Sequence, residues 1–279
     1  MRFDVALLTE RRYEAPKVGP GDAYKANILR DDQLLQDALK RLGKTSVRVD
    51  WSRADVDWRA FRLAVFRTTW DYFDRFGPFT AWLDEVARRT ALCNDLAIVR
   101  WNMDKHYLAD LAARDVEIVP TVFVEKGTSL DLNGLFKETG WEDAVLKPCV
   151  SGAARHTYRF DRRTIAEVEA IARGLLEDEA LMVQPFQENV CATGEDSLML
   201  VEGRFTHSVR KLARAGDFRV QDDHGGTVHD YEATAEQVEL AERALAACPS
   251  MPTYARVDLV RANDGRWALM ELELIEPEM

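Results

Sequence analysis

The fold is decided by the stretch Tyr254-Ala-Arg-Val-Asp-Leu-Val-Arg-Ala-Asn-Asp-Gly-Arg-Trp-Ala-Leu-Met-Glu-Leu-Glu-Leu-Ile-Glu-Pro277. Two apolar runs lie on either side of an Asn-Asp-Gly turn, and this pattern predicts a β-hairpin. Because side chains repeat every two residues along a strand, Arg256 and Asp258 share one face of the first strand. Glu271 and Glu273 share one face of the second strand for the same reason.

If the two charged faces coincide, three carboxylates and one guanidinium meet on a small patch. Carboxylates this close repel one another unless a cation lies among them. A set of oxygen ligands with room for phosphate oxygens suits Mg²⁺. The competing interpretation is a solvated hairpin face with scattered charges, and this stretch alone supports the two interpretations equally.

The composition is that of a globular protein. The chain has 279 residues, of which 47% are hydrophobic, enough for two units with separate cores. Its formal net charge of −11 argues against nonspecific nucleic-acid binding, which needs a basic surface. No segment approaches the roughly 20 apolar residues of a membrane helix, and the N-terminus resembles a first strand more than a signal peptide. We therefore expect a cytoplasmic protein with no membrane or nucleic-acid partner.

The four cysteines and five histidines are scattered along the chain. No pair of cysteines has C-x-x-C spacing, so neither a disulfide framework nor a zinc site is expected. The histidines show no metal-ligand pair either.

The first third of the chain alternates strands and helices. We expect strands at 3–8, 47–51 and 63–66, a loop at 9–25, and helices from 28 to 42 and from 79 to 89. This β-α-β order predicts a parallel sheet with helices on its faces. We place a domain boundary near residue 95.

A polar run, Arg67-Thr-Thr-Trp-Asp-Tyr72, follows the third of these strands. Ligands of open α/β sheets bind beyond the carboxyl ends of the strands, so Arg67, Thr69 and Asp71 are candidate substrate contacts. The alternative is that Trp70 and Tyr72 pack under the next helix, and the residues support both interpretations equally.

The rest of the chain also mixes strands and helices. Asn102 is expected to cap a helix that passes Lys105, and Pro120 suggests that a strand at 116–124 lies at a sheet edge. Further strands are expected at 144–148, 156–160 and 181–186, a hairpin at 197–209, and helices within 126–143 and at 164–177 and 234–247. The segments 149–155 and 217–227 are expected to be loops.

Lys147 lies near the end of one of these strands, and Ser151 and Gly152 follow in the loop. Such a lysine and loop can surround phosphate oxygens with a point charge and backbone N–H groups. The chain has no Walker motif and no G-x-G-x-x-G after its first strand, so neither a P-loop nor a Rossmann-type site is expected. A single lysine at a strand end is more often a solvated charge.

The order of these features resembles the ATP-grasp superfamily over about residues 95–277. Four runs look like its glutathione-synthetase-like branch, which contains the D-cycloserine-forming ligase: Arg67-Thr-Thr-Trp-Asp-Tyr, Leu146-Lys-Pro-Cys-Val-Ser-Gly, Tyr254-Ala-Arg-Val-Asp and Met270-Glu-Leu-Glu-Leu-Ile-Glu-Pro. The resemblance implies an α/β fold. A pre-ATP-grasp domain with a parallel sheet would span 1–95. An ATP-grasp domain would span 96–279, with a lid subdomain at about 96–180 and a metal-binding, catalytic subdomain at about 181–279.

The resemblance also implies roles for single residues. ATP would be bound by Lys105, Lys147, Ser151, Gly152, Gln184, Pro185 and Phe186, with Glu188 or Glu195 on the ribose hydroxyls and Arg210 or Lys211 as a further phosphate contact. Mg²⁺ would be bound by Asp258, Glu271 and Glu273, and the catalytic side chains would be Arg256 and Lys147. Candidate substrate contacts are Arg67, Thr69, Asp71, Arg155, His156, His224, Gly225 and Gly226.

The activity implied is ATP-dependent ligation in the biosynthesis of an antibiotic or amino-acid derivative. Transfer of the γ-phosphate to a substrate carboxylate gives an acylphosphate, and a nitrogen nucleophile then displaces phosphate. The substrate is expected to be small and amino-acid-like. Intermolecular ligation and intramolecular ring closure both stay open, as does the formation of a homo-oligomer.

Two other functions stay open. Relatives continue past the Ile-Glu-Pro segment, whereas this sequence ends at Met279, which would fit a nucleotide-binding module without turnover. A small-molecule kinase would use the same site and stop after phosphoryl transfer.

Overall fold

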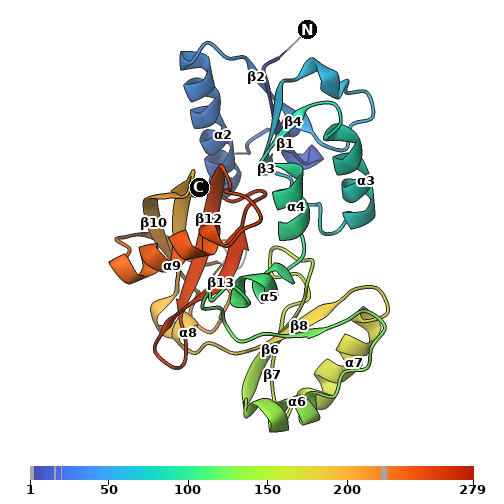
Figure 1. Cartoon of the computed structure of the whole chain (residues 1–279), viewed down its shortest axis with the longest axis vertical. Helices are drawn as coiled ribbons and strands as arrows, with labels where there is room; N and C mark the ends of the chain where they lie inside the picture. The colour runs from blue at the N-terminus through green and yellow to red at the C-terminus, as the bar shows by residue number, and fades with distance from the viewer. Residues whose placement is uncertain (1–2, 16, 20, 221–224) are drawn as a thin grey trace.

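The structure is a computed structural model that describes residues 3–15, 17–19, 21–220 and 225–279. The described strands form three sheets, one parallel and two antiparallel. In Figure 1 the parallel sheet lies at the top, and the two antiparallel sheets lie below it. This arrangement confirms the predicted fold class.

The parallel sheet is built from the first third of the chain and has the strand order β2-β1-β3-β4. Its strands are β1 (Val5–Thr9), β2 (Ser46–Asp50), β3 (Leu63–Thr68) and β4 (Ala91–Cys93). Helices α2 (Ala23–Arg41) and α3 (Phe76–Val86) lie on opposite sides of this sheet (Figure 1). The β-α-β prediction is confirmed.

The predicted loop at 9–25 is partly wrong. Helix α1 (Arg11–Glu14) lies inside it, and α2 already begins at Ala23. The Asp22 carboxylate caps α2 by accepting a hydrogen bond from the Lys25 N–H at 3.1 Å. Because the first buried apolar residue of α2 is Ile28, apolar spacing alone placed the start of this helix too late.

Aromatic rings fill the core between the parallel sheet and α3. The centroid of the Phe79 ring lies 5.1 Å from that of Trp51 and 5.2 Å from that of Tyr72. Rings of this size dominate the energetics of a core. Tyr72 is therefore a packing residue, whereas Trp70 lines a cavity described below.

The two antiparallel sheets hold the remaining strands. The five-stranded sheet, β11-β10-β9-β12-β13, consists of β9 (Glu195–Val201), β10 (Arg204–Leu212), β11 (Thr227–Tyr231), β12 (Tyr254–Arg261) and β13 (Trp267–Glu273). The four-stranded antiparallel sheet, β5-β8-β6-β7, consists of β5 (Val122–Val124), β6 (Asp143–Pro148), β7 (Tyr158–Asp161) and β8 (Leu181–Pro185).

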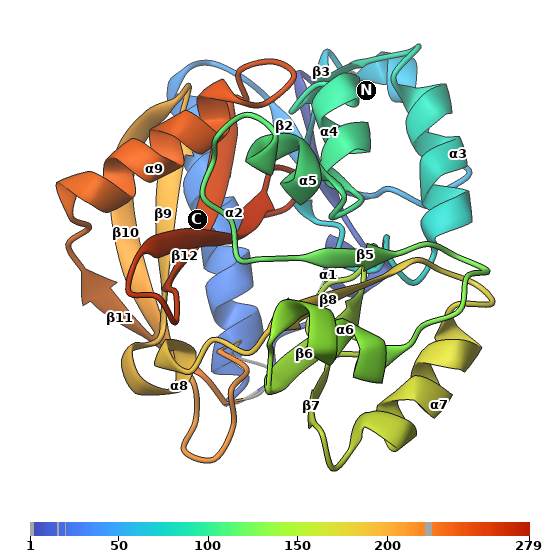
Figure 2. The same ribbon diagram turned by 60° about the horizontal axis from the view of Figure 1, so that its bottom comes forward.

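Helices cover one face of each antiparallel sheet (Figure 2). Helices α5 (Tyr107–Ala112) and α9 (Ala235–Ala246) pack on the five-stranded sheet. Helices α6 (Leu132–Thr139) and α7 (Ile165–Leu175) pack on the four-stranded antiparallel sheet. Three further elements are α4 (Leu96–Asn102), α8 (Asn189–Thr193) and the 3₁₀ turn η1 (Trp58–Ala60).

The predicted C-terminal hairpin is confirmed. Strands β12 and β13 pair antiparallel, with Arg256 opposite Glu273 and Asp258 opposite Glu271. In the turn, Gly265 has a φ of +84°, a conformation that glycine adopts without steric cost. The two charged faces therefore coincide.

The structure differs from the expected elements at two places, near residue 180 and at the strand expected over 116–124. Strand β8 pairs with β5 and β6, so the four-stranded antiparallel sheet extends past residue 180. The segment 116–124 is a strand only over Val122–Val124, at a sheet edge as Pro120 suggested. The part of this segment before Val122 lies beside β13 instead, where the Val119 N–H donates to Leu269 O at 3.0 Å. Strand β11 and helix α8 were not predicted.

Asn102 does not cap a helix; it is the last residue of α4, whose N-cap is Asp95. Its side-chain amide joins α4 to the edge strand β13. Its Nδ2 donates to Leu272 O at 2.8 Å, and the Leu274 N–H donates to its Oδ1 at 2.8 Å. An amide satisfies both a donor and an acceptor of β13, which explains why asparagine stands here.

Replacement of Asn102 by alanine is expected to lower the free energy of unfolding by about 3 kcal/mol, because two buried backbone groups of β13 lose their partners. The measurement is urea denaturation. The control is Asn133→Ala on the exposed face of α6, which should cost under about 0.5 kcal/mol. Equal costs for the two variants would contradict the role given to Asn102.

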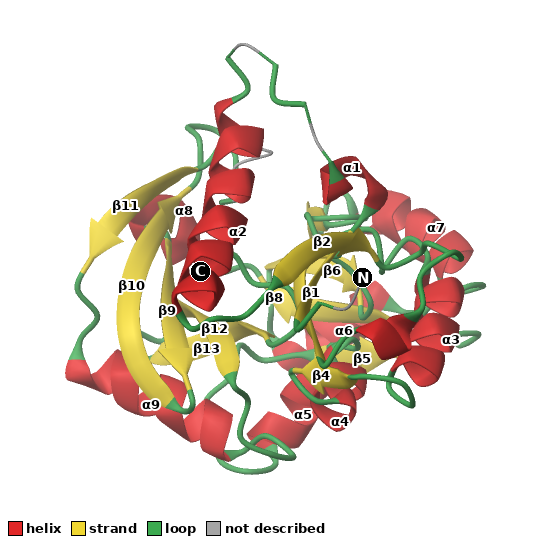
Figure 3. Ribbon diagram, turned by 90° about the horizontal axis from the view of Figure 1, so that it is seen from above, coloured by secondary structure: helices red, strands yellow, loops and turns green. Residues whose placement is uncertain are grey.

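No helix in the described part of the chain is long and apolar enough to cross a membrane. Residues Pro277, Glu278 and Met279 border a depression that Tyr24 and Asn27 of α2 also line. Figure 3 shows the C-terminus beside α2. The last residues therefore lie against the N-terminal unit, although they follow directly from the five-stranded sheet.

Candidate active site

A cleft lies between the four-stranded antiparallel sheet and the five-stranded sheet. Strands β6 and β8 line one side, β9, β10, β12 and β13 line the other, and the segments 151–154 and 218–220 border it. The sequence candidates in its lining are Lys105, Lys147, Ser151, Gly152, Gln184, Pro185, Phe186, Glu195, Lys211, Arg256, Asp258, Glu271 and Glu273. The structure thus brings together most of the residues assigned to ATP and Mg²⁺.

The charged face of the hairpin is organised by Arg256. Its Nε donates to Asp258 Oδ1 at 2.9 Å, and its Nη2 donates to Asp258 Oδ2 at 2.8 Å and to the Glu273 carboxylate. The Ser197 hydroxyl donates to Asp258 Oδ1 at 2.5 Å. Burial would raise the pKa of Asp258, but Arg256 and Lys211 outweigh burial and hold this pKa well below its usual range. Asp258 is therefore a carboxylate at neutral pH.

Two lysines face the other carboxylates. Lys105 Nζ lies 3.0 Å from Glu271 Oε1 and donates to Ser151 O at 2.7 Å. Lys211 Nζ lies 3.3 Å from Glu195 Oε1 and 3.4 Å from Asp258 Oδ1. Each carboxylate of the cleft thus has a cation beside it in the absence of nucleotide.

Lys147 differs from these lysines. Among the described residues it has no carboxylate within the 4 Å of an ion pair, and burial lowers its pKa. A buried ammonium without a close counter-charge is costly, and a phosphate oxygen in the cleft would remove that cost.

Glu188 and Glu195 are separated by the fold. Glu188 is exposed and does not line the cleft, whereas Glu195 lies inside it. Burial, outweighing Lys211, raises the pKa of Glu195 to about 7. Burial likewise raises the pKa of Glu273 to about 7 despite Arg256, and Asp258 adds to the rise. Both groups hold protons near neutral pH chiefly because they are buried, and the neighbouring carboxylates add to this effect.

The end of the cleft nearest to β8 is apolar, with Val145, Val190 and Met270 in its lining. The Phe186 N–H, expected to contact adenine, already donates to Asp143 O at 2.9 Å. The backbone N–H of the next residue, Gln187, has no acceptor in the described part of the chain. The backbone N–H that can donate to the edge of a base is therefore that of Gln187, one residue beyond the segment 184–186 that was expected to contact adenine.

The loop after β6 has an unusual backbone. Ala153 and Ala154 have φ values of +49° and +55°, a region that alanine rarely adopts. Residues held in such conformations cluster at ligand-binding loops. A Cβ atom on Gly152 would lie 2.6 Å from Phe73 Cε1, so only glycine allows this loop to approach the N-terminal unit so closely.

A second cavity of about 460 Å³ lies between the N-terminal unit and the five-stranded sheet. It shares several lining residues with the cleft, among them Gly152, Lys211, Arg256 and Glu273. Its volume lies in the range of small-molecule sites. The two hollows therefore meet at Arg256.

The expected substrate contacts divide into two groups. Asp71 and Arg155 line the second cavity. Arg67 does not, because its Nε donates to the buried Asp32 at 2.8 Å and its Nη2 pairs with Asp31. Thr69 is fully buried outside the cavities.

Three other expected contacts also lie elsewhere. His156 is exposed and stacks on Tyr158. Gly225 and Gly226 line neither hollow. His224 lies outside the described residues.

Several residues of the second cavity were missed. Tyr13, Tyr24, Trp70 and Phe73 come from the N-terminal unit, and Glu276 follows β13. Glu276 belongs to the quoted Glu-Leu-Glu-Leu-Ile-Glu-Pro run and is the one signal that sequence reasoning could have used. The aromatic residues carry no periodicity that distinguishes a cavity wall from a core.

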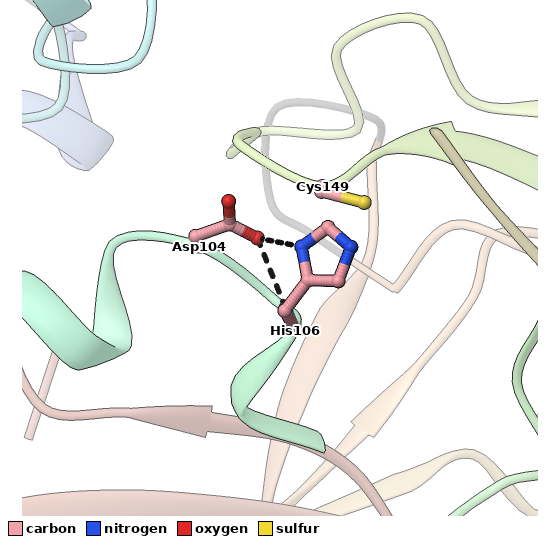
Figure 4. Close-up of side chains that lie close together, drawn as sticks. All are labelled: Asp104, His106 and Cys149. Atoms are coloured by element: carbon pink, nitrogen blue, oxygen red, sulfur yellow. Dashed lines mark hydrogen bonds and ion pairs between the residues drawn. The ribbon is translucent and has the colours of Figure 1, made fainter. Parts of the chain in front are cut away.

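Asp104, His106 and Cys149 form a separate group behind the cleft (Figure 4), with candidate ligand atoms within 4.8 Å of one another. His106 Nδ1 lies 2.5 Å from Asp104 Oδ1 and its Nε2 lies 3.2 Å from Glu125 Oε1. Both ring nitrogens thus already face carboxylates. Burial raises the pKa of the Cys149 thiol, which keeps it protonated. The arrangement fits a hydrogen-bonded anchor for the Lys105 loop better than a metal centre.

Comparison with known proteins identifies relatives over nearly the whole chain. Residues 5–94 match the family model described as the N-terminal domain of the D-cycloserine synthetase DcsG. The cycloserine biosynthesis protein DcsG of Streptomyces lavendulae is 32% identical in an alignment of 277 residues that covers 92% of this chain and 90% of that protein. A crystal structure of D-cycloserine synthetase DcsG aligns with a TM-score of 0.82 at 30% identity, covering 98% of this chain and 92% of that chain. The D-alanine–D-alanine ligase of Bacillus anthracis in complex with ATP aligns with a TM-score of 0.67 at 14% identity, covering 98% of this chain and 86% of that chain, a likeness of fold alone.

Proposed function

Because this chain belongs to the DcsG family of ATP-grasp ligases, which form carbon–nitrogen bonds, we propose that it closes a ring within a small amino-acid-like substrate while ATP is converted to ADP and phosphate. The observation that carries this proposal is the junction of the two hollows at Arg256. ATP would occupy the cleft between the antiparallel sheets, and the substrate would occupy the second cavity. The reacting atoms would then meet beside one guanidinium.

The first step is activation of a carboxylate. A substrate carboxylate oxygen attacks the γ-phosphorus, ADP leaves, and an acylphosphate forms. Lys105, Lys147 and Lys211 lie where they would bind the phosphate oxygens, and Arg256 would stabilise the charge on the transferred group. In the second step, a nitrogen of the same molecule attacks the acyl carbon, loses a proton, and expels phosphate.

The acylphosphate must be kept from water, which would hydrolyse it. The 151–154 loop borders both hollows and contacts Phe73 of the N-terminal unit. We propose that this loop closes over the junction when both ligands are bound. Its strained Ala153 and Ala154 would be the segment that changes conformation.

The donor set fits Mg²⁺. Asp258, Glu271 and Glu273 supply only oxygen atoms, stand at paired positions of β12 and β13, and face the cleft. Burial raises the pKa of Glu273 despite Arg256, and Asp258 and Glu271 add to the rise, so a further cation bound here would stabilise its ionised form. Mg²⁺, when bound, would neutralise charge on the β- and γ-phosphates.

The apolar end of the cleft would hold the adenine ring. Phe186 and Val190 supply apolar surface there. We propose that the Gln187 N–H, which has no acceptor among the described residues, donates to the base edge. Glu195, and not the exposed Glu188, remains as the candidate for the ribose hydroxyls or the metal.

The test is ADP release measured with Mg²⁺-ATP and a panel of O-substituted D- and L-serines, followed by mass spectrometry of the products. A product that has a lower mass than its substrate and contains no second amino acid supports ring closure. A dipeptide product would show that the protein catalyses intermolecular ligation in place of ring closure. A stable phosphorylated acid would show that it is a kinase. ATP-independent turnover would overturn the proposal.

Nucleotide binding is expected to strengthen as pH rises from about 6 to about 8. Glu195 and Glu273 have a pKa of about 7 in the free protein, so they must lose protons before a cation can use them. Calorimetry at pH 6.5 in buffers of different ionisation enthalpy should detect roughly one proton released per Mg²⁺-ATP bound. Glu273→Gln should release less, whereas Glu188→Gln should match the wild type. An unchanged heat in all buffers would contradict this prediction.

The same groups set the pH dependence of the ligand-free protein. Their pKa of about 7 lies above the ordinary 4.5, so between these values the folded protein binds more protons than the unfolded chain. Their contribution to stability is therefore present below about pH 4.5 and is lost as pH rises through 7. Mg²⁺-ATP should restore part of that loss.

A further inference from the structure

The second cavity is lined by charged side chains, and most of these already have partners. Each basic side chain in the lining is close to a carboxylate: Arg12 to Glu10, Arg155 to Glu179, Lys211 to Glu195, and Arg256 to Asp258. Asp71 accepts from the Trp51 indole N–H at 2.7 Å and from Arg75 at 2.9 Å. Asp74 lies 3.3 Å from the Arg155 guanidinium. These groups neutralise one another before a substrate enters.

Glu276 is the exception. Its half-buried carboxylate lines the cavity and forms no ion pair with any described residue, and its own backbone N–H is the hydrogen-bond donor that lowers its pKa. Burial first, and Glu273 second, raise the pKa of Glu276 well above its ordinary value. A carboxylate withdrawn from water and placed beside other carboxylates is costly unless a cation joins it. The cavity therefore has, at one defined point, an acidic group without a counter-charge, and an entering cation would stabilise its ionised form.

The walls around this point are aromatic. The Trp70 indole N–H donates to Glu276 O at 3.3 Å, which holds the two residues together. The Trp70 ring centroid lies 5.5 Å from that of Tyr13 and 6.5 Å from that of Tyr24. Aromatic faces attract cations, and ammonium groups in particular. The Glu276 carboxyl group and the aromatic rings beside it thus both favour an ammonium group.

The position of Glu276 relates this acidic group to the reaction. It follows Glu273 by three residues and lies in the cavity that Arg256 joins to the nucleotide cleft. An amino group held at Glu276 would leave the carboxylate of the same molecule free to approach Arg256. That geometry is the one an α-amino acid derivative needs for activation at its carboxylate.

We propose that Glu276 binds the protonated amino group of the substrate, with Trp70 as the adjoining wall, and so selects acids that carry an amine. The inference rests on the proposed function for the identity of the second cavity as the substrate site. It makes Glu276 a specificity residue, because the amine that it holds does not react. The ammonium and the carboxylate form a charge-assisted hydrogen bond, which is among the stronger polar contacts available to a ligand.

The test compares O-methyl-D-serine with 3-methoxypropanoate, its counterpart without the amine. Binding of each to the protein saturated with a non-hydrolysable Mg²⁺-ATP analogue is measured by calorimetry. The wild type is expected to prefer the amine by at least about 30-fold, and Glu276→Gln is expected to reduce this preference to about threefold or less. Glu188→Gln, which changes an exposed carboxylate that lines neither hollow, is the control and should keep the preference of the wild type.

The outcomes separate the two proposals. Affinity for the nucleotide analogue should be the same in the wild type and in Glu276→Gln, which shows that the variant is folded. A preference for the amine that survives in Glu276→Gln, or that the wild type lacks, overturns the role of Glu276 even if ADP is released. A preference that Glu276→Gln abolishes, in a protein that releases no ADP with any acid, supports Glu276 and overturns ligation instead.

Discussion

Asp258→Asn is expected to lower kcat/KM for ADP formation by about 10³-fold, the loss typical of removing a group that stabilises charge in the transition state. The substitution keeps the size of the side chain and removes its charge. An amide would also turn its N–H group toward Arg256 or Ser197, which now donate to the carboxylate at 2.8 and 2.5 Å. The Mg²⁺-ATP site would lose its most buried carboxylate, which is 2% exposed.

The measurement is a coupled ADP-release assay together with thermal unfolding, with and without Mg²⁺-ATP. In the wild type, nucleotide at about 100 times its dissociation constant should add about 2.7 kcal/mol of stability, and in Asp258→Asn this gain should be mostly lost. Asp264→Asn is the matched control, because Asp264 lies in the turn of the same hairpin and pairs only with Arg266 among the described residues. Wild-type turnover in Asp258→Asn would show that the metal is bound elsewhere.

Arg256→Lys is expected to lower kcat by about 10²- to 10³-fold while changing the affinity for the nucleotide by less than about threefold. Arginine donates through a planar fork, here to both oxygens of Asp258 and to Glu273. Lysine keeps the positive charge but has a single nitrogen, so it cannot hold both carboxylates and also contact a transferring phosphoryl group. The effect should therefore appear in the chemical step, where Arg256 stands between the two hollows.

Steady-state kinetics and calorimetry with a non-hydrolysable nucleotide separate these two quantities. Arg261→Lys provides the control, because Arg261 is an exposed arginine on the same strand. Its Cζ atom lies 5.3 Å from the centroid of the Trp267 ring. A loss of nucleotide affinity in Arg256→Lys that matched the loss of kcat would mean that Arg256 binds the ground state. Arg256 would then not be the group that stabilises the transition state.

The hairpin, and the shared face of the charged residues within each of its strands, could be predicted because both depend on local rules. Alternation places Arg256 with Asp258 and Glu271 with Glu273, and the Asn-Asp-Gly turn brings the two strands together. Whether the two charged faces coincide depends on the register, which shifts between Asp258 and Leu259 and so sets Arg256 opposite Glu273. Alternation and the turn alone do not predict this shift. The parallel sheet could also be predicted from local patterns, since its strands and helices alternate along the sequence.

Predictions for single substrate contacts were less accurate, because they depend on neighbours that are distant in sequence. Arg67 follows a strand end as expected, but Asp31 and Asp32 of α2 bind its guanidinium. Glu188 and Glu195 are both acidic residues after β8, and only the fold places one in the cleft and the other in solvent. Local patterns cannot distinguish such pairs.

The sequence was sufficient for the features that form locally. These are the C-terminal hairpin, the alternating strands and helices before residue 95, and the order of motifs that marks an ATP-grasp ligase. The tertiary structure alone decided which side chains face the same space. Tyr13 and Trp70 meet Glu276 in one cavity although more than 200 residues separate them from it. No periodicity encodes such a meeting, because it arises when separate sheets pack together and leave a cavity between them.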